Sequence, residues 1–224
     1  MVDAKVEIQK MWCIFAVGSN SILELRALSP LGITPKLKPI TKHFRVADCK
    51  SRDYCRLAFE EEALRLNALG FNIYIVMNPI KAGFAGYAAC DADIAFRQLM
   101  LIDIDRAVKN IEPANDAEVE AARLVANDVI GYLAKHDFSD PIRVMSGNGH
   151  HLYYVLKDIP NTPDAEATVE AILHNLARKF DNPKVKVDTV VFNASRITKV
   201  PGTIMRKGVE SDGRPYRMAV IYEE

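Results

Sequence analysis

Short stretches rich in β-branched and aromatic residues, several with polar residues at alternate positions, recur along the chain and predict β-strands. They lie at residues 22–28, 43–46, 71–77, 98–105, 142–145, 151–156, 185–192 and 217–222. Glycine, proline, asparagine or aspartate separates many of these stretches, as expected of turns.

Apolar residues recur every three to four positions in three longer segments, which predicts amphipathic helices. These segments are residues 53–69, residues 115–136 and a stretch that starts at Thr162 and Pro163. Asn115 and Glu118 have the spacing of a capping box, which marks the start of the second helix. The order of strands and helices predicts an α+β fold whose helices pack on one face of a largely antiparallel sheet.

The composition is that of an ordinary globular protein. The 224 residues are 49% hydrophobic, so the chain can form one domain with its own core. No apolar stretch approaches the roughly 20 residues that span a bilayer, and the first residues lack the features of a signal peptide. We therefore expect a cytoplasmic protein with no membrane partner.

Charge and cysteine content restrict the candidate partners and cofactors. Lys plus Arg equals Asp plus Glu at 29 each, so a nucleic acid would have to bind a local basic patch. Arg45, Lys50, Arg52 and Arg214 are candidates for it, although solvated surface positions explain them about as well. The cysteines form no CxxC pair, and we expect free thiols instead of a zinc cluster or disulfides.

The stretch LIDID places two carboxylates on one predicted strand. Because side chains alternate along a strand, Asp103 and Asp105 share one face while Ile102 and Ile104 enter the core on the other. Two such acids repel each other unless a cation lies between them, and hard divalent ions prefer oxygen ligands. The alternative is an edge strand that exposes two acids to water.

The stretch SGNGHH follows at a predicted bend between two strands. Gly147 and Gly149 permit a tight turn whose N–H groups can approach an anion. If His151 shares the face of Asp103, its imidazole can bind a phosphate oxygen, and His150 then points to the other face. The alternative is an ordinary Asn-Gly hairpin with an exposed histidine.

A third stretch, residues 187–208, combines an acid with several cations. Asp188 precedes a basic series around a Pro-Gly turn, which consists of Arg196, Lys199, Arg206 and Lys207. Acids that hold a metal and cations that neutralise phosphate charge are what a metal–triphosphate site requires. A solvated basic loop is the alternative.

In this order the three stretches resemble the motifs of the archaeo-eukaryotic primase superfamily, the primase-polymerases, particularly those of phages, plasmids and other mobile replicons. LIDIDR is similar to the acid-x-acid motif, SGNGHHLYY to the motif that ends in a histidine, and VDTVVFNASRITKVPGT to an acid followed by an arginine. Weaker likeness covers roughly residues 20–222. The resemblance implies a single catalytic domain. In it, an RRM-like module with a mostly antiparallel sheet, at about residues 96–224, joins a smaller α/β N-terminal unit at about residues 1–95.

The resemblance also implies template-directed nucleotidyl transfer, in which primers are made or extended on single-stranded DNA. Two Mg²⁺ or Mn²⁺ ions would be held by Asp103, Asp105 and Asp188. The triphosphate of an NTP or dNTP would be bound by His151, Arg196 and one of Lys199 or Lys207, with Ser146 and Asn148 as helpers. Expected partners are template, primer, and a replicative helicase or another replication protein.

Two other classes of protein remain open. A replication-initiator nuclease presents two histidines separated by one apolar residue, with a tyrosine nucleophile, whereas His150 and His151 are adjacent and would point apart. A non-catalytic nucleic-acid-binding replication module has no use for clustered acids that repel phosphate.

Overall fold

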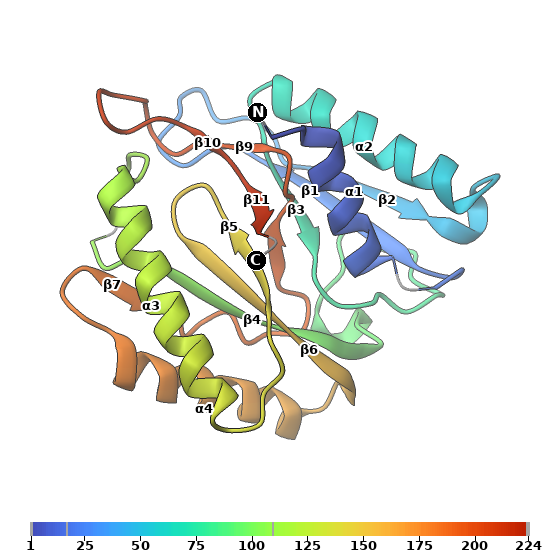
Figure 1. Ribbon diagram of the computed structural model, residues 1–224. Coiled ribbons are helices and arrows are strands. Elements are labelled where there is room, and N and C mark those ends of the chain that lie inside the picture. The colour runs from blue at the N-terminus through green and yellow to red at the C-terminus, as the bar shows by residue number, and fades with distance from the viewer. Residues whose placement is uncertain (1, 17, 109, 223–224) are drawn as a thin grey trace.

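The computed structural model describes residues 2–16, 18–108 and 110–222, and these form two antiparallel sheets with α-helices packed against them (Figure 1). Every strand pair within the two sheets is antiparallel. This arrangement confirms the predicted α+β class.

The first sheet has the strand order β2-β1-β3-β8. Its strands are β1 (Ile22–Leu28), β2 (Ile40–Arg45), β3 (Asn72–Val76) and β8 (Ile197–Lys199). Helix α2 (Arg52–Ala68) packs against β1, β2 and β3, and helix α1 (Ala4–Phe15) contacts α2 and the second sheet. The strand β8 joins this sheet from the far end of the sequence.

The second sheet has the order β11-β5-β6-β4-β7. Its strands are β4 (Phe96–Arg106), β5 (Ile142–Met145), β6 (His150–Pro160), β7 (Val185–Val187) and β11 (Val220–Tyr222). Helix α3 (Asp116–Ala134) packs against β4, β6 and β7, and helix α4 (Pro163–Phe180) packs against β7 and α3. A short ribbon of β9 (Ile204–Met205) and β10 (Arg217–Met218) follows β8, and short 3₁₀ turns lie at Val46–Asp48 and Asp91–Asp93.

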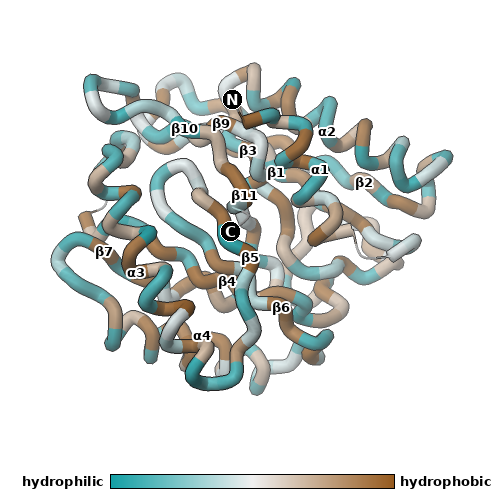
Figure 2. The backbone as a smooth tube through the Cα atoms, viewed as in Figure 1, coloured by the Kyte–Doolittle hydropathy of each residue, from teal (hydrophilic) through white to brown (hydrophobic). Residues whose placement is uncertain are grey.

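One continuous hydrophobic core connects the two sheets. It includes Leu25 and Ile75 of the first sheet and Ile102 and Leu152 of the second. In Figure 2 hydrophobic residues recur along the strands and helices, whereas hydrophilic residues lie both in the loops and along the helices. The division near residue 95 stays a prediction. However, the four-stranded sheet takes its edge strand β8 from residues well beyond that boundary.

The predicted elements differ from the observed ones at several places. The strand predicted at residues 217–222 forms two strands, β10 and β11, in different sheets. Helix α1 was not among the predicted helices; Asp3 caps it, and Glu7 accepts a hydrogen bond from the Ile221 N–H at 2.6 Å. The strand predicted at residues 185–192 is wrong after Val187, because the Asp188 carboxylate accepts a hydrogen bond from the Val190 N–H at 3.0 Å and turns the chain away from the sheet. Strands β8 and β9 are not among the predicted strands.

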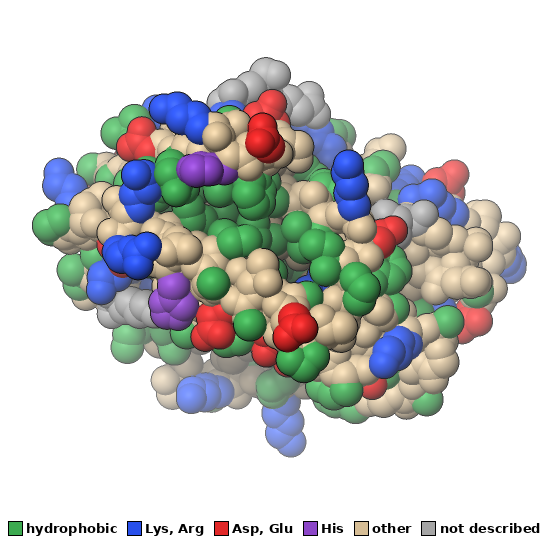
Figure 3. All heavy atoms as spheres, turned by 90° about the horizontal axis from the view of Figure 1, so that it is seen from below, with side chains coloured by type: hydrophobic (Ala, Val, Ile, Leu, Met, Phe, Trp, Pro, Cys, Tyr) green, Lys and Arg blue, Asp and Glu red, His purple; other side chains and the backbone are tan. Residues whose placement is uncertain are grey.

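One face of the molecule carries charged side chains of both signs. On the face drawn in Figure 3, Lys and Arg side chains lie apart from one another among acidic and hydrophobic ones. Among the described residues, no helix is both long and apolar enough to cross a membrane.

Candidate active site

The two acids of LIDID lie on β4, which has β6 on one side and β7 on the other. Ile102 and Ile104 are completely buried, whereas the Asp103 side chain is 25% exposed. The strand alternation therefore directs the isoleucines into the core toward α3 and leaves the carboxylates on the opposite face. That face is turned toward the four-stranded sheet, because Leu28 of β1 and Tyr74 of β3 line the same cavity as Asp103.

The two adjacent histidines project to opposite faces of β6. His151 pairs with Asp103 across the sheet, and its Nε2 lies 3.4 Å from the Asp103 Oδ1. His150 pairs with Ile104, and its ring stacks on Tyr222 with centroids 5.7 Å apart. Burial, together with His151 and Arg123, lowers the pKa of His150 to about 4, so this ring is neutral near pH 7.

Both glycines of the SGNG turn occupy positions where a side chain would collide. A Cβ atom on Gly149 would lie 2.4 Å from the Ile104 carbonyl oxygen and 2.9 Å from the Asp105 Oδ1. Gly147 has φ +99°, and its added Cβ would lie 2.6 Å from the Cβ of Met205. Gly149 therefore lets the turn lie directly against the strand end that carries Asp105, and Gly147 lets it lie against β9.

The side chains of Ser146 and Asn148 are used inside the protein. The Ser146 hydroxyl accepts a hydrogen bond from the Gly149 N–H at 3.2 Å, and the Asn148 Oδ1 accepts one from the Ala114 N–H at 2.8 Å. Both residues are at least 95% buried, with 1% and 5% of their surface exposed. Neither lines the cavities at the acids, so their predicted role as nucleotide ligands has no contact in its favour.

The third acid is held beside the first by the backbone. The Asp188 N–H donates a hydrogen bond to the Asp103 carbonyl oxygen at 2.8 Å. Asp103 and Asp188 border two adjoining cavities, one of about 620 Å³ and one of about 280 Å³. The larger cavity is also lined by Asp105 and Lys207, and the smaller by His151, Arg196 and Lys199. Seven of the predicted site residues thus surround one region between the sheets.

The surroundings shift the pKa values of Asp103 and Asp105, the two acids of β4, in opposite directions. Burial disfavours the ionised form of Asp103, but His151, Lys199 and Arg196 outweigh it and lower the pKa of Asp103. Burial and the negative charge of Asp103 raise the pKa of Asp105, although Lys199 and Lys207 oppose this. Asp105 is therefore the acid that a further positive charge would stabilise most.

The donor atoms at this region suit a hard divalent cation in type. Carboxylate oxygens are the ligands that Mg²⁺ and Mn²⁺ prefer, and Asp103, Asp105 and Asp188 all border the larger cavity. Among the residues that the structure describes, no three Asp, Glu, His or Cys side chains lie close enough together to hold one metal ion. These acids would have to close around an ion to share it.

Several residues at the region were not singled out from the sequence. The Thr198 hydroxyl lies 3.0 Å from the His151 Nδ1 and 2.8 Å from the Tyr153 hydroxyl. Tyr74 lines the smaller cavity from β3. Thr198 lies within the third motif, but its neighbours become visible only once β8 is placed in the first sheet.

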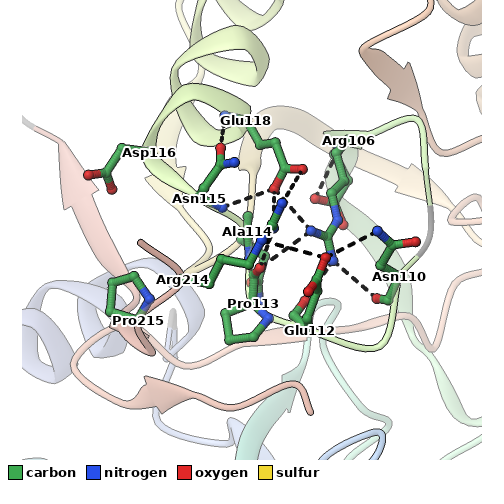
Figure 4. Close-up of polar contacts among 12 residues, drawn as sticks. Arg106, Asn110, Glu112, Pro113, Ala114, Asn115, Asp116, Glu118, Arg214 and Pro215 are labelled. Carbon is green, nitrogen blue, oxygen red and sulfur yellow. Dashed lines mark hydrogen bonds and ion pairs between the residues drawn. The ribbon is translucent and has the colours of Figure 1, made fainter. Parts of the chain in front are cut away.

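A partly buried ion-pair cluster holds the chain just after Asp105 (Figure 4). Arg106 is 4% exposed, and its guanidinium binds the Glu118 carboxylate at 3.0 Å and the Glu112 carbonyl oxygen at 2.6 Å. Arg214 binds the same carboxylate at 2.8 Å and 3.1 Å and the Pro113 carbonyl oxygen at 2.8 Å. Arg214 is therefore a structural residue in this state, which argues against its predicted place in a basic patch for nucleic acid.

The other basic-patch candidates are also engaged within the protein. The Arg45 guanidinium donates to the Phe84 carbonyl oxygen, and that of Arg52 donates to the Ala16 carbonyl oxygen. The Lys50 ammonium lies 5.9 Å from the centroid of the Tyr54 ring.

The stability of the protein at acid pH should depend on the ion-pair cluster in Figure 4. Burial acts to raise the pKa of Glu118, but hydrogen bonds from Arg214, the Asn115 N–H and Arg106 lower it from 4.5 to about 2. Its ionised form therefore stabilises the fold above about pH 4.5, and this contribution is lost as the pH falls toward 2. We expect Glu118→Gln to lower the Tm at pH 7 by roughly 2–4 °C, the shift for about 1 kcal/mol in a chain of this size.

The same variant should also flatten the decline of Tm between about pH 4.5 and pH 2.5. Circular dichroism melts at half-unit pH steps measure both effects. The matched control is Glu61→Gln, at an exposed position of α2, which should leave the slope unchanged. Equal slopes for Glu118→Gln and the wild type would show that the cluster does not depend on the ionised carboxylate.

Comparison with solved structures finds a similar fold. The polymerase domain from Mycobacterium tuberculosis Ligase D, solved in complex with DNA, matches with a TM-score of 0.51 and 15% sequence identity. The match covers 90% of this chain and 75% of that chain. This chain shares its fold with a polymerase domain. No protein-family model matches the sequence, and no curated protein matches it either.

Proposed function

We propose that this protein is a template-directed nucleotidyltransferase that makes primers, extends DNA, or both, on a single-stranded template. The observation that carries the proposal is the gathering of Asp103, Asp105 and Asp188 with a histidine and three cationic side chains around adjoining cavities between the two sheets. A polymerase domain with a similar fold supports it. Acids for a metal and cations for a triphosphate are the groups that nucleotidyl transfer requires.

In this proposal the acids and the cations have separate tasks. Asp103, Asp105 and Asp188 would hold divalent cations, either Mg²⁺ or Mn²⁺. Such ions lower the pKa of an attacking 3′-hydroxyl and stabilise charge at the α-phosphate. The triphosphate would be neutralised by Arg196, Lys199 and Lys207 and would receive a hydrogen bond from His151.

The proposed partners are a single-stranded DNA template, a primer and an NTP or dNTP. Incorporation of one nucleotide forms a bond between its α-phosphorus and the 3′-oxygen of the primer and breaks the anhydride bond between its α- and β-phosphates. Pyrophosphate leaves, and the proton of the 3′-hydroxyl passes to water. The similarity of the three motifs to those of mobile replicons supports a role in phage or plasmid replication, beside a helicase or another replication protein.

The nuclease alternative is less well supported by the geometry. It requires two imidazoles at one site, whereas His151 faces Asp103 and His150 faces Tyr222 on the other side of the sheet. A non-catalytic DNA-binding role does not explain the acids beside the cationic side chains.

A primer-extension assay tests the proposal. The purified chain is incubated with a labelled primer on single-stranded template, Mg²⁺ or Mn²⁺, and either dNTPs or NTPs. We expect template-dependent extension that stops when EDTA removes the divalent ions. A parallel reaction on unprimed template measures primer synthesis. Cleavage of the template in place of extension would support the nuclease, and binding without either reaction would support the non-catalytic module.

A further inference from the structure

A series of hydrogen bonds between buried hydroxyl and imidazole groups joins the two sheets at the candidate site. Thr198 lies on β8 of the four-stranded sheet, whereas His151 and Tyr153 lie on β6 of the five-stranded sheet. The Thr198 Oγ1 is 2.8 Å from the Tyr153 hydroxyl and 3.0 Å from the His151 Nδ1. Their exposed fractions are 1% for Thr198, 0% for Tyr153 and 3% for His151, so water does not replace these contacts.

The protons in this series of hydrogen bonds can be assigned by counting donors and acceptors. Burial raises the pKa of Tyr153, which therefore keeps its hydroxyl proton at neutral pH. Among the described residues, Thr198 is the hydrogen-bond partner of that hydroxyl, so Tyr153 donates to Thr198. The Thr198 oxygen then carries one proton of its own, and the remaining partner for it is the His151 Nδ1.

This assignment fixes the tautomer of the neutral imidazole. A nitrogen that accepts a hydrogen bond carries no proton, so the ring proton of neutral His151 is on Nε2. The Nε2 atom lies 3.4 Å from the Asp103 Oδ1 and has no hydrogen-bond partner that meets ordinary geometry among the described residues. The Tyr153–Thr198–His151 hydrogen bonds therefore leave the His151 Nε2–H as a donor that faces the acids of the site. The opposite tautomer would present a lone pair to a carboxylate.

We propose that Thr198 is a positioning residue, which holds His151 in the Nε2–H tautomer so that it donates a hydrogen bond into the nucleotide site. Tyr153 supports Thr198 by donating its own proton to the threonine oxygen. The Tyr153 oxygen is then not the acceptor of the threonine proton, which is left for the His151 Nδ1. The link to nucleotide binding rests on the proposed function, whereas the tautomer itself does not.

Two substitutions at one position separate this role from simple packing. Thr198→Val keeps the shape and removes the hydroxyl, and Thr198→Ser keeps the hydroxyl. We expect Thr198→Val to raise the KM for the nucleotide about five- to tenfold, the size of one lost hydrogen bond, with kcat changed less than about threefold. Thr198→Ser should restore the KM to within about twofold of the wild type.

Thr203→Val is the matched control. Thr203 is a fully buried threonine in the same segment, and its hydroxyl donates to the Val200 carbonyl oxygen at 2.6 Å, away from His151. Its replacement should lower the Tm without changing the KM. If Thr198→Val also lowers the Tm and leaves the KM at the wild-type value, or if Thr198→Ser is as impaired as Thr198→Val, the positioning role is wrong.

Nitrogen-15 NMR of the histidine rings tests the tautomer without any assay of activity. Spectra are recorded at one fixed pH, and His151→Gln assigns the His151 signals by their loss. The wild type should show a protonated Nε2 and an unprotonated Nδ1, and Thr198→Val should lose this preference. An Nδ1–H tautomer in the wild type would overturn the inference even if the protein extends primers. If the protein shows the expected tautomer but incorporates no nucleotide, the inference about Thr198 stands and only the proposed function is contradicted.

Discussion

Asp103→Asn and Asp105→Asn should each reduce nucleotide incorporation by about a hundredfold or more, because each removes a carboxylate proposed to bind the divalent ions. The rate of single-nucleotide addition at saturating dNTP and millimolar Mn²⁺ measures this. The matched control is Asp181→Asn. Asp181 borders the same cavity, but its Oδ1 accepts a hydrogen bond from the Val187 N–H at 2.9 Å, so this variant should retain incorporation. Wild-type rates for either β4 variant would refute the assignment of the acids.

Asp103→Asn and Asp105→Asn should differ in thermal stability, and neither should unfold the protein. Their Tm values therefore separate a loss of activity from a loss of fold. The pKa of Asp105 is raised by burial and by Asp103, so ionising it at pH 7 costs stability and Asp105→Asn should raise the Tm. The pKa of Asp103 is lowered, because His151, Lys199 and Arg196 outweigh the effect of burial, and Asp103→Asn should leave the Tm unchanged or slightly lower. Thermal melts at pH 7 in the presence of EDTA test this order.

His151→Ala should raise the KM for the nucleotide by about ten- to a hundredfold, the range for a lost hydrogen bond to a charged group, while template affinity stays near the wild-type value. His150→Ala should leave the KM within about twofold. Its ring stacks on Tyr222 behind the sheet, so its loss should lower the Tm by creating a cavity. Nucleotide titrations and fluorescence anisotropy with labelled template measure the two affinities.

The comparison of His151→Ala with His150→Ala also tests whether His151 acts by orienting Asp103. The Nε2 atom faces the Asp103 carboxylate at 3.4 Å in this structure. If the histidine acts only by orienting that acid, His151→Ala will lower kcat and leave the KM unchanged, which would contradict the triphosphate role. A loss of nucleotide affinity in His150→Ala with none in His151→Ala would contradict the assignment of the two faces.

The parts of the site that the sequence predicts correctly depend on local periodicity. The alternation of LIDID places Asp103 and Asp105 on one face, and the adjacency of the histidines sends His150 and His151 to opposite faces. A strand has a fixed period of two, so these relations hold wherever the strand lies in the fold. The capping box at Asn115 is local in the same way and is confirmed.

The parts that the sequence does not predict depend on contacts between distant segments. Strand β8 is only Ile197–Lys199 and pairs with β3, more than a hundred residues earlier, so no local pattern reveals it. The position of Thr198 beside His151 follows from that pairing. Nothing in the local sequence distinguishes Arg214 from a surface cation. Its place in an ion-pair cluster follows from its contact with Glu118, which lies 96 residues earlier in the sequence.

The most direct test of the central claim is a stoichiometric measurement of nucleotidyl transfer. The purified protein is mixed with primed single-stranded template, Mn²⁺ and one labelled dNTP complementary to the next template base. Incorporated label and released pyrophosphate are counted together. The account predicts one pyrophosphate for each nucleotide added by the wild type and by Asp181→Asn, and neither product from the double variant Asp103→Asn/Asp105→Asn. Equal incorporation by the double variant, or no incorporation by the folded wild type, would contradict the account.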